Sequence, residues 1–183
     1  MRKTALALGL ALAAGFGSKM GVLTSSSAAA PPPAANAPAD RQGTAPPAYT
    51  MAAPVARMVM IRLRNGTDVL EGLQKGVAEQ RIRNAVIVGG FGSVIRYHVH
   101  VVSTPELPTV DAFVKVNRPQ DVLNVSGYVI DGRLHPHITL ADQEKAAGGH
   151  LEPDTHVLTF LNVALAVLPD DASLARFDDW QWR

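Results

Sequence analysis

The stretch from Asp131 to Glu152 constrains the fold of this chain more than any other, because a hairpin signal adjoins a strand pattern there. Asp131-Gly132 is a dipeptide typical of a two-residue turn between antiparallel strands. The residues that follow, 133–141, alternate in character as a strand with one buried face does. The apolar members of this alternation are Leu134, Ile138 and Leu140. We therefore expect a strand whose apolar face packs on a core while its other face carries His135 and His137.

A third histidine, His150, follows from the same pattern. If Gln143 and Glu144 form the middle of the next reversal, His150 lies directly across from His137 on the neighbouring strand. His135 and His137 are roughly 6–7 Å apart at the backbone by the strand rise, so three imidazoles can converge. Three neutral imidazoles with an open fourth position suit zinc first, with nickel, copper or iron(II) as alternatives.

The competing interpretation is that these histidines are unrelated. In it, His135 and His137 are exposed on a solvated sheet face, and spacing alone is a weak indication of a metal site. His98 and His100 repeat the same spacing on an earlier strand. They are a possible second site, or partners that orient the ligands, but surface histidines are the favoured interpretation because no third ligand is evident nearby. Asp142 can orient a ligand imidazole or accept a turn amide, and the second use is commoner.

The N-terminus reads as an export signal. Met1-Arg2-Lys3 is basic, residues 4–16 are apolar, and small residues follow, which predicts a secretory signal peptide over residues 1–28 and a periplasmic or extracellular protein. An uncleaved anchor is the alternative; after cleavage no stable membrane span is expected. Residues 29–54, rich in Ala, Pro and Ser, are expected to be a flexible linker, and residues 55–183 one domain.

Composition restricts the chemistry of the domain. The chain contains no cysteine, so thiolate ligands, thiol catalysis and disulfides are excluded, and any metal must use nitrogen and oxygen donors. The formal net charge is +1. Removal of residues 1–28 takes away Arg2, Lys3 and Lys19, which leaves 14 basic and 16 acidic residues. A DNA-binding domain normally shows a basic surplus, so this balance disfavours DNA as a partner.

The rest of the domain reads as one helix followed by many strands. Residues 55–64 alternate as a strand, and residues 68–80 have helical spacing with Asp68 and Glu71 placed as in a capping box. Residues 84–88 form a short apolar strand, which should run parallel to the first strand through a right-handed crossover. The Gly-rich residues 89–93 precede another strand, not a helix, so we expect a chain reversal or bulge there instead of a phosphate loop.

Short antiparallel strands should precede and follow a loop at 104–109. They are expected at 94–103, 112–116, 122–130, 133–141, 149–151 and 157–168. The fold class is therefore α+β, a mostly antiparallel sheet with one main helix after the first strand. Trp180 and Trp182, at strand spacing, are expected to be packing anchors.

Several motifs together resemble a known family. They occur in the order TDVLE (67–71), GSV (92–94), LNVSG (123–127), DG-x-x-HPH (131–137), AD (141–142) and GGHL (148–151). In this order they resemble the plant and prokaryote conserved domain (PPC domain), which also occurs beside AT-hook motifs in plant nuclear proteins. The resemblance covers about residues 57–168, and DG-x-x-HxH to GGHL is its most specific part.

The resemblance implies an α+β domain that assembles as a homotrimer. For prokaryotic members it also implies a metal, usually zinc, and here the ligands would be His135, His137 and His150. The chain departs from the plant members, because it has no Arg-Gly-Arg-Pro core of an AT-hook and carries Arg118-Pro119-Gln120 in the partner-binding loop. Gln143-Glu144-Lys145 likewise replaces the usual Asp-Gly turn.

These observations predict an exported, trimeric zinc-binding module with an unknown small ligand or partner. Two alternatives stay open. A metal-dependent enzyme would need a general base, and the acids close in sequence are Asp142, Glu144 and Glu152, each with a simpler role as a turn or surface residue. A DNA-binding protein, by family analogy, would need a local basic patch. Its candidate residues are Arg57, Arg62, Arg64, Arg81 and Arg83.

Overall fold

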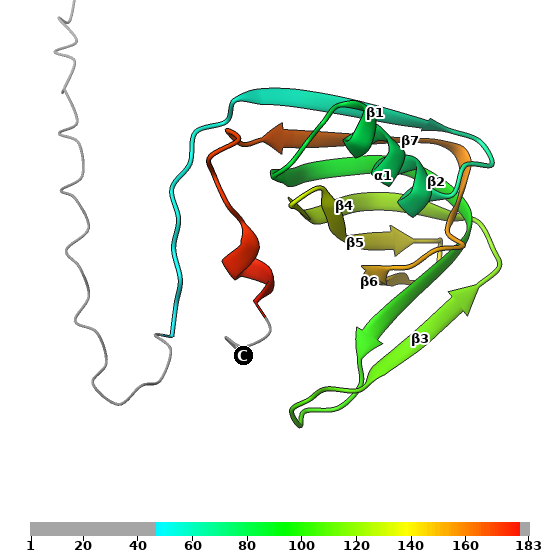
Figure 1. The fold of residues 1–183 in the computed structure, drawn as a ribbon. Helices are drawn as coiled ribbons and strands as arrows, with labels where there is room; N and C mark the ends of the chain where they lie inside the picture. The colour runs from blue at the N-terminus through cyan, green and yellow to red at the C-terminus, as the bar shows by residue number, and fades with distance from the viewer. Residues whose placement is uncertain (1–46, 180–183) are drawn as a thin grey trace, which may run out of the picture. The chain divides into compact units, whose positions relative to one another are not determined.

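The computed structural model describes residues 47–179 (Figure 1). Its elements are β1 (Arg57–Arg64), α1 (Val69–Glu79), β2 (Ala85–Val102), β3 (Asp111–Val116), β4 (Gln120–Ile130), β5 (Arg133–Ala141), β6 (Ala146–Leu151), β7 (His156–Val167) and a 3-10 helix (Ala175–Asp178). Every strand pairing is antiparallel. The predicted fold class, α+β with a mostly antiparallel sheet and a helix after the first strand, is confirmed.

Some predictions concern residues outside this range. The signal peptide at 1–28, most of the linker at 29–54, and Trp180 and Trp182 lie outside the described residues. Residues 47–56 have no helix or strand. Between residues 47 and 179, no helix combines the length and the apolar character that crossing a membrane requires.

The sheet curls because β2 changes partners along its length. The strand order is β1-β7-β2-β4-β5-β6, with β3 paired to β2 off this path. The first part of β2 pairs with β4, whereas Val99 and His100 pair with β6. Because β6 also pairs with β5, the strands β2, β4, β5 and β6 form a closed ring of pairings. This closure brings the second half of β2 beside the predicted histidine hairpin.

The expected parallel direction of the first two strands is confirmed, but the two strands are not neighbours in the sheet. β1 and β2 do run in the same direction, but β7 lies between them and pairs antiparallel with both. The two strands expected at 84–88 and 94–103 are one long strand, β2 (Ala85–Val102), and of the two alternatives for the Gly-rich segment the bulge is the one observed. At Gly92 a Cβ would overlap the Phe160 carbonyl oxygen of β7, so glycine here permits close strand approach.

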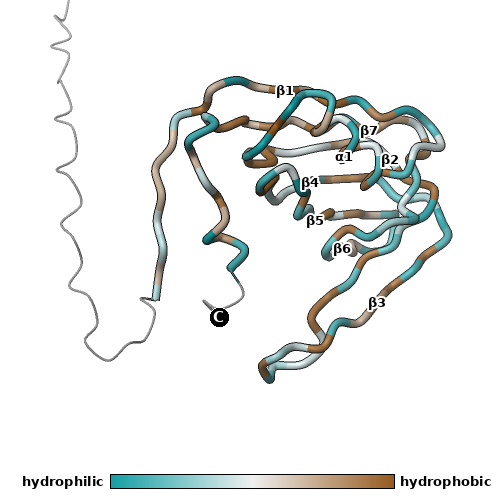
Figure 2. The backbone as a smooth tube through the Cα atoms, in the orientation of Figure 1, coloured by the Kyte–Doolittle hydropathy of each residue, from teal (hydrophilic) through white to brown (hydrophobic). Residues whose placement is uncertain are grey.

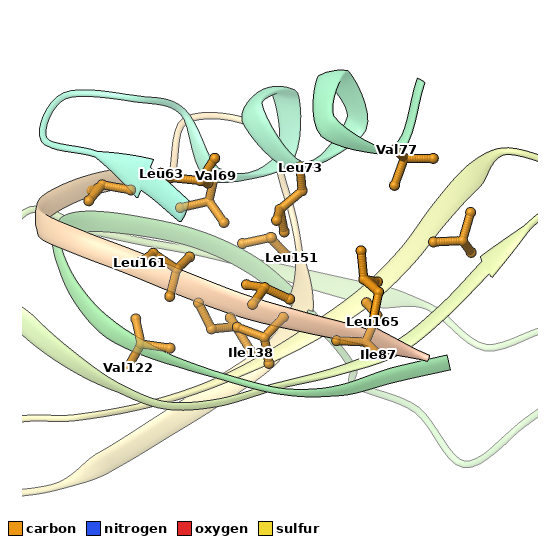
Figure 3. Packing of buried hydrophobic residues seen from close by; sticks show 14 of the residues in the cluster. Leu63, Val69, Leu73, Val77, Ile87, Val122, Ile138, Leu151, Leu161 and Leu165 are labelled. Atoms are coloured by element: carbon orange, nitrogen blue, oxygen red, sulfur yellow. The ribbon is translucent and has the colours of Figure 1, made fainter. Parts of the chain in front are cut away.

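The helix α1 covers the apolar side of the sheet. Asp68 caps it by accepting a hydrogen bond from the Glu71 N–H at 3.0 Å, as the capping pattern predicts. Val69, Leu73 and Val77 are buried and point from the helix toward sheet residues (Figure 3). On β5, Ile138 and Leu140 are buried and Leu134 packs against the same core. The core-facing side of β5 is therefore the one that the alternation predicts.

The outer end of β2 and β3 form a two-stranded arm that extends from the sheet (Figure 1). Apolar segments lie along this arm (Figure 2). Its exposed apolar residues are Val101, Val102, Leu107, Val110, Phe113 and Val114. The pairing of β2 with β3 runs from Tyr97 to Val102 and places His100 opposite Phe113, so the base of the arm contributes to the histidine cluster.

Candidate metal centre

Strand register places three histidines in one row. In the β5–β6 pairing His137 lies opposite His150, as the hairpin centre at Gln143 and Glu144 predicts. In the β6–β2 pairing His100 lies opposite the same His150. Directly paired residues share a face of the sheet, and His135 lies on that face two residues along β5. His150 is therefore in the middle of a cluster of four imidazoles.

The rings of the three predicted ligands are close neighbours. Their centroids are 5.7 Å apart for His135 and His137, 4.8 Å for His135 and His150, and 5.2 Å for His137 and His150. Rings bound to one tetrahedral ion at metal–nitrogen distances of about 2.0–2.1 Å have centroids about 5 Å apart. The structure thus brings together the three histidines that the sequence singled out, at separations that suit one ion.

Carboxylates border the cluster on several sides. The Glu152 Oε1 atom lies 2.6 Å from His100 Nδ1 and 3.6 Å from His150 Nδ1. Asp178, from the 3-10 helix, places its Oδ1 atom 3.3 Å from His135 Nδ1. The Asp111 Oδ2 atom is 3.8 Å from the other edge of His100, at Nε2. Carboxylates beside imidazoles are the usual means by which proteins orient histidine ligands.

The sequence interpretation named His100 as a possible partner of the ligands and Glu152 as a nearby acid, but favoured a surface role for both. In the described part of the chain, the group whose three ligand atoms all lie within 4.8 Å of one another is His100, His150 and Glu152, and such a group could hold a metal ion. The His100 and Glu152 side chains are only 22% and 21% exposed, so neither is a simple surface residue. The second His-x-His motif, His98 and His100, was a sequence signal for a role of His100 near the metal centre. The pairing of β2 with β6, which brings His100 to His150, could not be predicted from local sequence.

The other two residues considered as ligand partners have different roles. His98 lies on the same strand as His100; its Nδ1 atom is 2.8 Å from the Pro153 carbonyl oxygen, and its ring lies 5.8 Å from that of Phe113. Asp142 is at the β5–β6 turn, where it accepts hydrogen bonds from the Glu144 and Lys145 N–H groups. The turn role that the sequence favoured for Asp142 is thus the one observed.

Further contacts hold Asp142 in the turn. The Gln120 amide donates to its carboxylate at 2.6 Å, and Arg118 pairs with it. The backbone N–H of Glu144, the Gln120 amide and the N–H of Lys145, with the Arg118 charge, lower the pKa of Asp142 to about 2. The carboxylate is therefore ionised at neutral pH and stabilises the hairpin that carries His137 and His150.

Two imidazoles of the cluster have shifted pKa values. Burial lowers the pKa of His137 below its ordinary value, and the charges of His135 and His100 lower it further. Burial also lowers the pKa of His150, with contributions from His135, His100 and His137, while the Glu152 charge opposes the shift. Both rings are therefore neutral at pH 7, which is the protonation state that binds a metal.

Comparisons with known proteins agree with the architecture. The family model of the Plants and Prokaryotes Conserved (PCC) domain, the PPC domain of the resemblance above, matches residues 51–169. A search of the curated proteins gives no match.

Three solved structures are similar to this chain. A metal-containing protein from Archaeoglobus fulgidus is 22% identical, with a TM-score of 0.58 over 68% of this chain and 89% of that protein. A hypothetical protein from Salmonella enterica is 25% identical, with a TM-score of 0.55 over 66% and 83% of the two chains. A plant- and prokaryote-conserved protein from Pyrococcus horikoshii is 19% identical, with a TM-score of 0.57 over 68% and 87%.

Proposed function

Because the chain belongs to the family of the Plants and Prokaryotes Conserved (PCC) domain, we propose that it is an exported metal-binding module that holds zinc at His135, His137 and His150. The observation that carries this proposal is the mutual approach of the three rings, with centroids 4.8–5.7 Å apart. Their nitrogens come from two adjacent strands of a closed ring of pairings. The positions of the ligands are thus held by backbone hydrogen bonds before any ion arrives.

The orientation of His135 supports the same set. Its Nδ1 edge faces the Asp178 carboxylate at 3.3 Å. A carboxylate on this side favours the tautomer with the proton on Nδ1, and that tautomer leaves the Nε2 lone pair for an ion. The similar protein from Archaeoglobus fulgidus is described as metal-containing, which agrees with a metal role for this fold. Three imidazole donors without thiolate suit zinc first, and other divalent transition metals also fit.

We further propose that the module is a homotrimer. Four large apolar side chains on β1, β2 and β4 are exposed and line one hollow of about 490 Å³. They are Met60, Val88, Phe91 and Leu123, here called the apolar face. Contiguous exposed apolar patches often mark surfaces where proteins associate. A second and a third copy of the chain would cover it.

Metal analysis of the purified protein tests the proposed site. The wild-type protein should retain one zinc per chain, and a His135→Ala/His137→Ala/His150→Ala variant should retain none. His98→Ala is the matched control, because His98 lies on a neighbouring strand and bonds to the Pro153 carbonyl. Equal zinc content in the wild-type and triple-variant proteins would rule out this site. Circular dichroism shows whether the variant still folds, and a folded variant without metal indicates that the ion serves a function other than holding the fold.

A further inference from the structure

His150 separates two groups of donor atoms. On one side, across the β5–β6 pairing, are His137 and His135. On the other side, across the β6–β2 pairing, is His100, whose ring centroid is 4.5 Å from that of His150. Glu152 follows two residues after His150 and contacts this second side. The proposed zinc site uses only the first group.

The His150 Nδ1 atom faces the second group and has no hydrogen-bond partner. It is buried from solvent, and the Glu152 Oε1 atom lies 3.6 Å away, beyond hydrogen-bond distance. Buried polar atoms in folded proteins nearly always have a partner, so an unpaired ring nitrogen beside a carboxylate calls for an explanation. A bound cation between the two atoms would satisfy both.

The separations in this group suit a shared ion. Two ligands of one tetrahedral zinc ion lie about 3.3 Å apart, because each is about 2.0–2.1 Å from the metal. The distance between Glu152 Oε1 and His150 Nδ1, 3.6 Å, is already close to that value. The distance between Glu152 Oε1 and His100 Nδ1, 2.6 Å, is that of a charge-assisted hydrogen bond. An ion would replace the proton of this bond, and the two atoms would have to separate by less than about 1 Å.

The opposite edge of His100 is arranged as in a metal ligand. Its Nε2 atom faces the Asp111 Oδ2 atom at 3.8 Å. A ligand histidine commonly directs its second ring N–H to a carboxylate, which fixes the tautomer and the ring orientation. With Nδ1 toward the ion and Nε2–H toward Asp111, His100 follows this pattern.

We propose that His100, His150 and Glu152 form a second metal position in the same centre, with a donor set of two imidazoles and one carboxylate. This proposal rests on the proposed function, since the two positions share His150. A neutral imidazole has one nitrogen lone pair, so His150 serves one position at a time. A set of two histidines and one glutamate is an established zinc donor set with room for a further ligand such as water.

The test uses a variant that lacks the first group. In His135→Ala/His137→Ala protein we expect zinc binding, measured by isothermal titration calorimetry, to persist at one ion per chain. Adding His100→Gln and Glu152→Gln to this variant should abolish it. Adding His98→Gln instead should leave it unchanged, because that ring bonds to the Pro153 carbonyl. The glutamine substitutions keep side-chain size, and circular dichroism and thermal unfolding confirm that each variant is folded.

The outcomes separate this proposal from the proposed function. If the His135→Ala/His137→Ala protein binds no zinc while the wild-type protein does, the second position is refuted and the first site stands. If the added His100→Gln and Glu152→Gln changes leave binding intact, the second position is also refuted. If the His135→Ala/His137→Ala protein binds zinc with unchanged affinity, and His100→Gln/Glu152→Gln alone abolishes binding, the ion belongs to the second position and the first site fails.

Discussion

Three histidine side chains of the cluster each contact a carboxylate that can orient the ring. Asp178 faces Nδ1 of His135, and Glu152 faces Nδ1 of both His100 and His150. These contacts decide which ring nitrogen is free, and hence where an ion can be bound. Asp178 is not a ligand in either proposed position, but it can still influence where an ion is bound through its contact with His135.

Acidification should lower the free energy of unfolding of the metal-free protein through His137 and His150. The pKa values of His137 and His150 are lowered from 6.5 in the folded state, so the unfolded chain binds more protons just below that pH. Stability should therefore fall as pH decreases from about 6.5 to the lowered folded-state values, with no further loss from these groups below them. Urea unfolding of the metal-free protein at pH 7.5, 6.5 and 5.5 measures this. His137→Gln should reduce the pH dependence, and a slope equal to that of wild type would contradict the argument.

At the scale of single elements, β6 decides the geometry of the centre. This short strand pairs with β5 on one side and with β2 on the other, and it carries His150 between them. On its other side β5 pairs with β4, where Tyr128 lies opposite His135, so β4 fixes the position of His135 along the sheet. Gly127 precedes Tyr128, with φ of +123°, in a region that favours glycine.

Gly127→Ala should disturb β5 at His135. A Cβ at residue 127 would overlap the His135 carbonyl oxygen, and the backbone conformation would be strained as well. We expect a loss of roughly 1–3 kcal/mol in the free energy of unfolding from strain alone, together with weaker zinc binding. Chemical denaturation and calorimetry measure the two effects. Ser126→Ala, one residue earlier on an exposed position, is the control and should change neither. A Gly127→Ala protein as stable as the control would show that β5 can shift freely.

At the scale of the whole molecule, the sheet has two different surfaces. One is covered by α1 and forms the core. The other exposes the apolar face of Met60, Val88, Phe91 and Leu123, of which Met60 is 73% exposed. The family match ends at residue 169, whereas the Asp178 contact to His135 comes from the segment after it. The contact between Asp178 and His135 therefore involves a residue outside the part of the chain that the family model covers.

The proposed trimer should depend on the apolar face. Phe91→Glu places a charge among these side chains and should convert the trimer to monomers while the fold and zinc content persist, because Phe91 is 60% exposed. Size-exclusion chromatography with light scattering measures the mass. Leu107→Glu, at a residue that is 68% exposed in the loop between β2 and β3, is the control and should remain trimeric. A wild-type protein that is monomeric in solution would contradict the proposal.

Most of the helices and strands could be predicted from local sequence patterns, whereas only the tertiary structure showed which strands pair with one another. The hairpin at Asp131-Gly132, the buried face of β5, the cap of α1 and the opposition of His137 and His150 were predictable, because each depends on residues close in sequence. The place of β7 between β1 and β2, and the pairing of β6 with β2, were not. Strand pairing between distant segments depends on how the whole sheet twists and buries its core, and no short pattern encodes it. For that reason the sequence by itself identified His135, His137 and His150, whereas only the folded chain placed His100, Glu152 and Asp178 beside them.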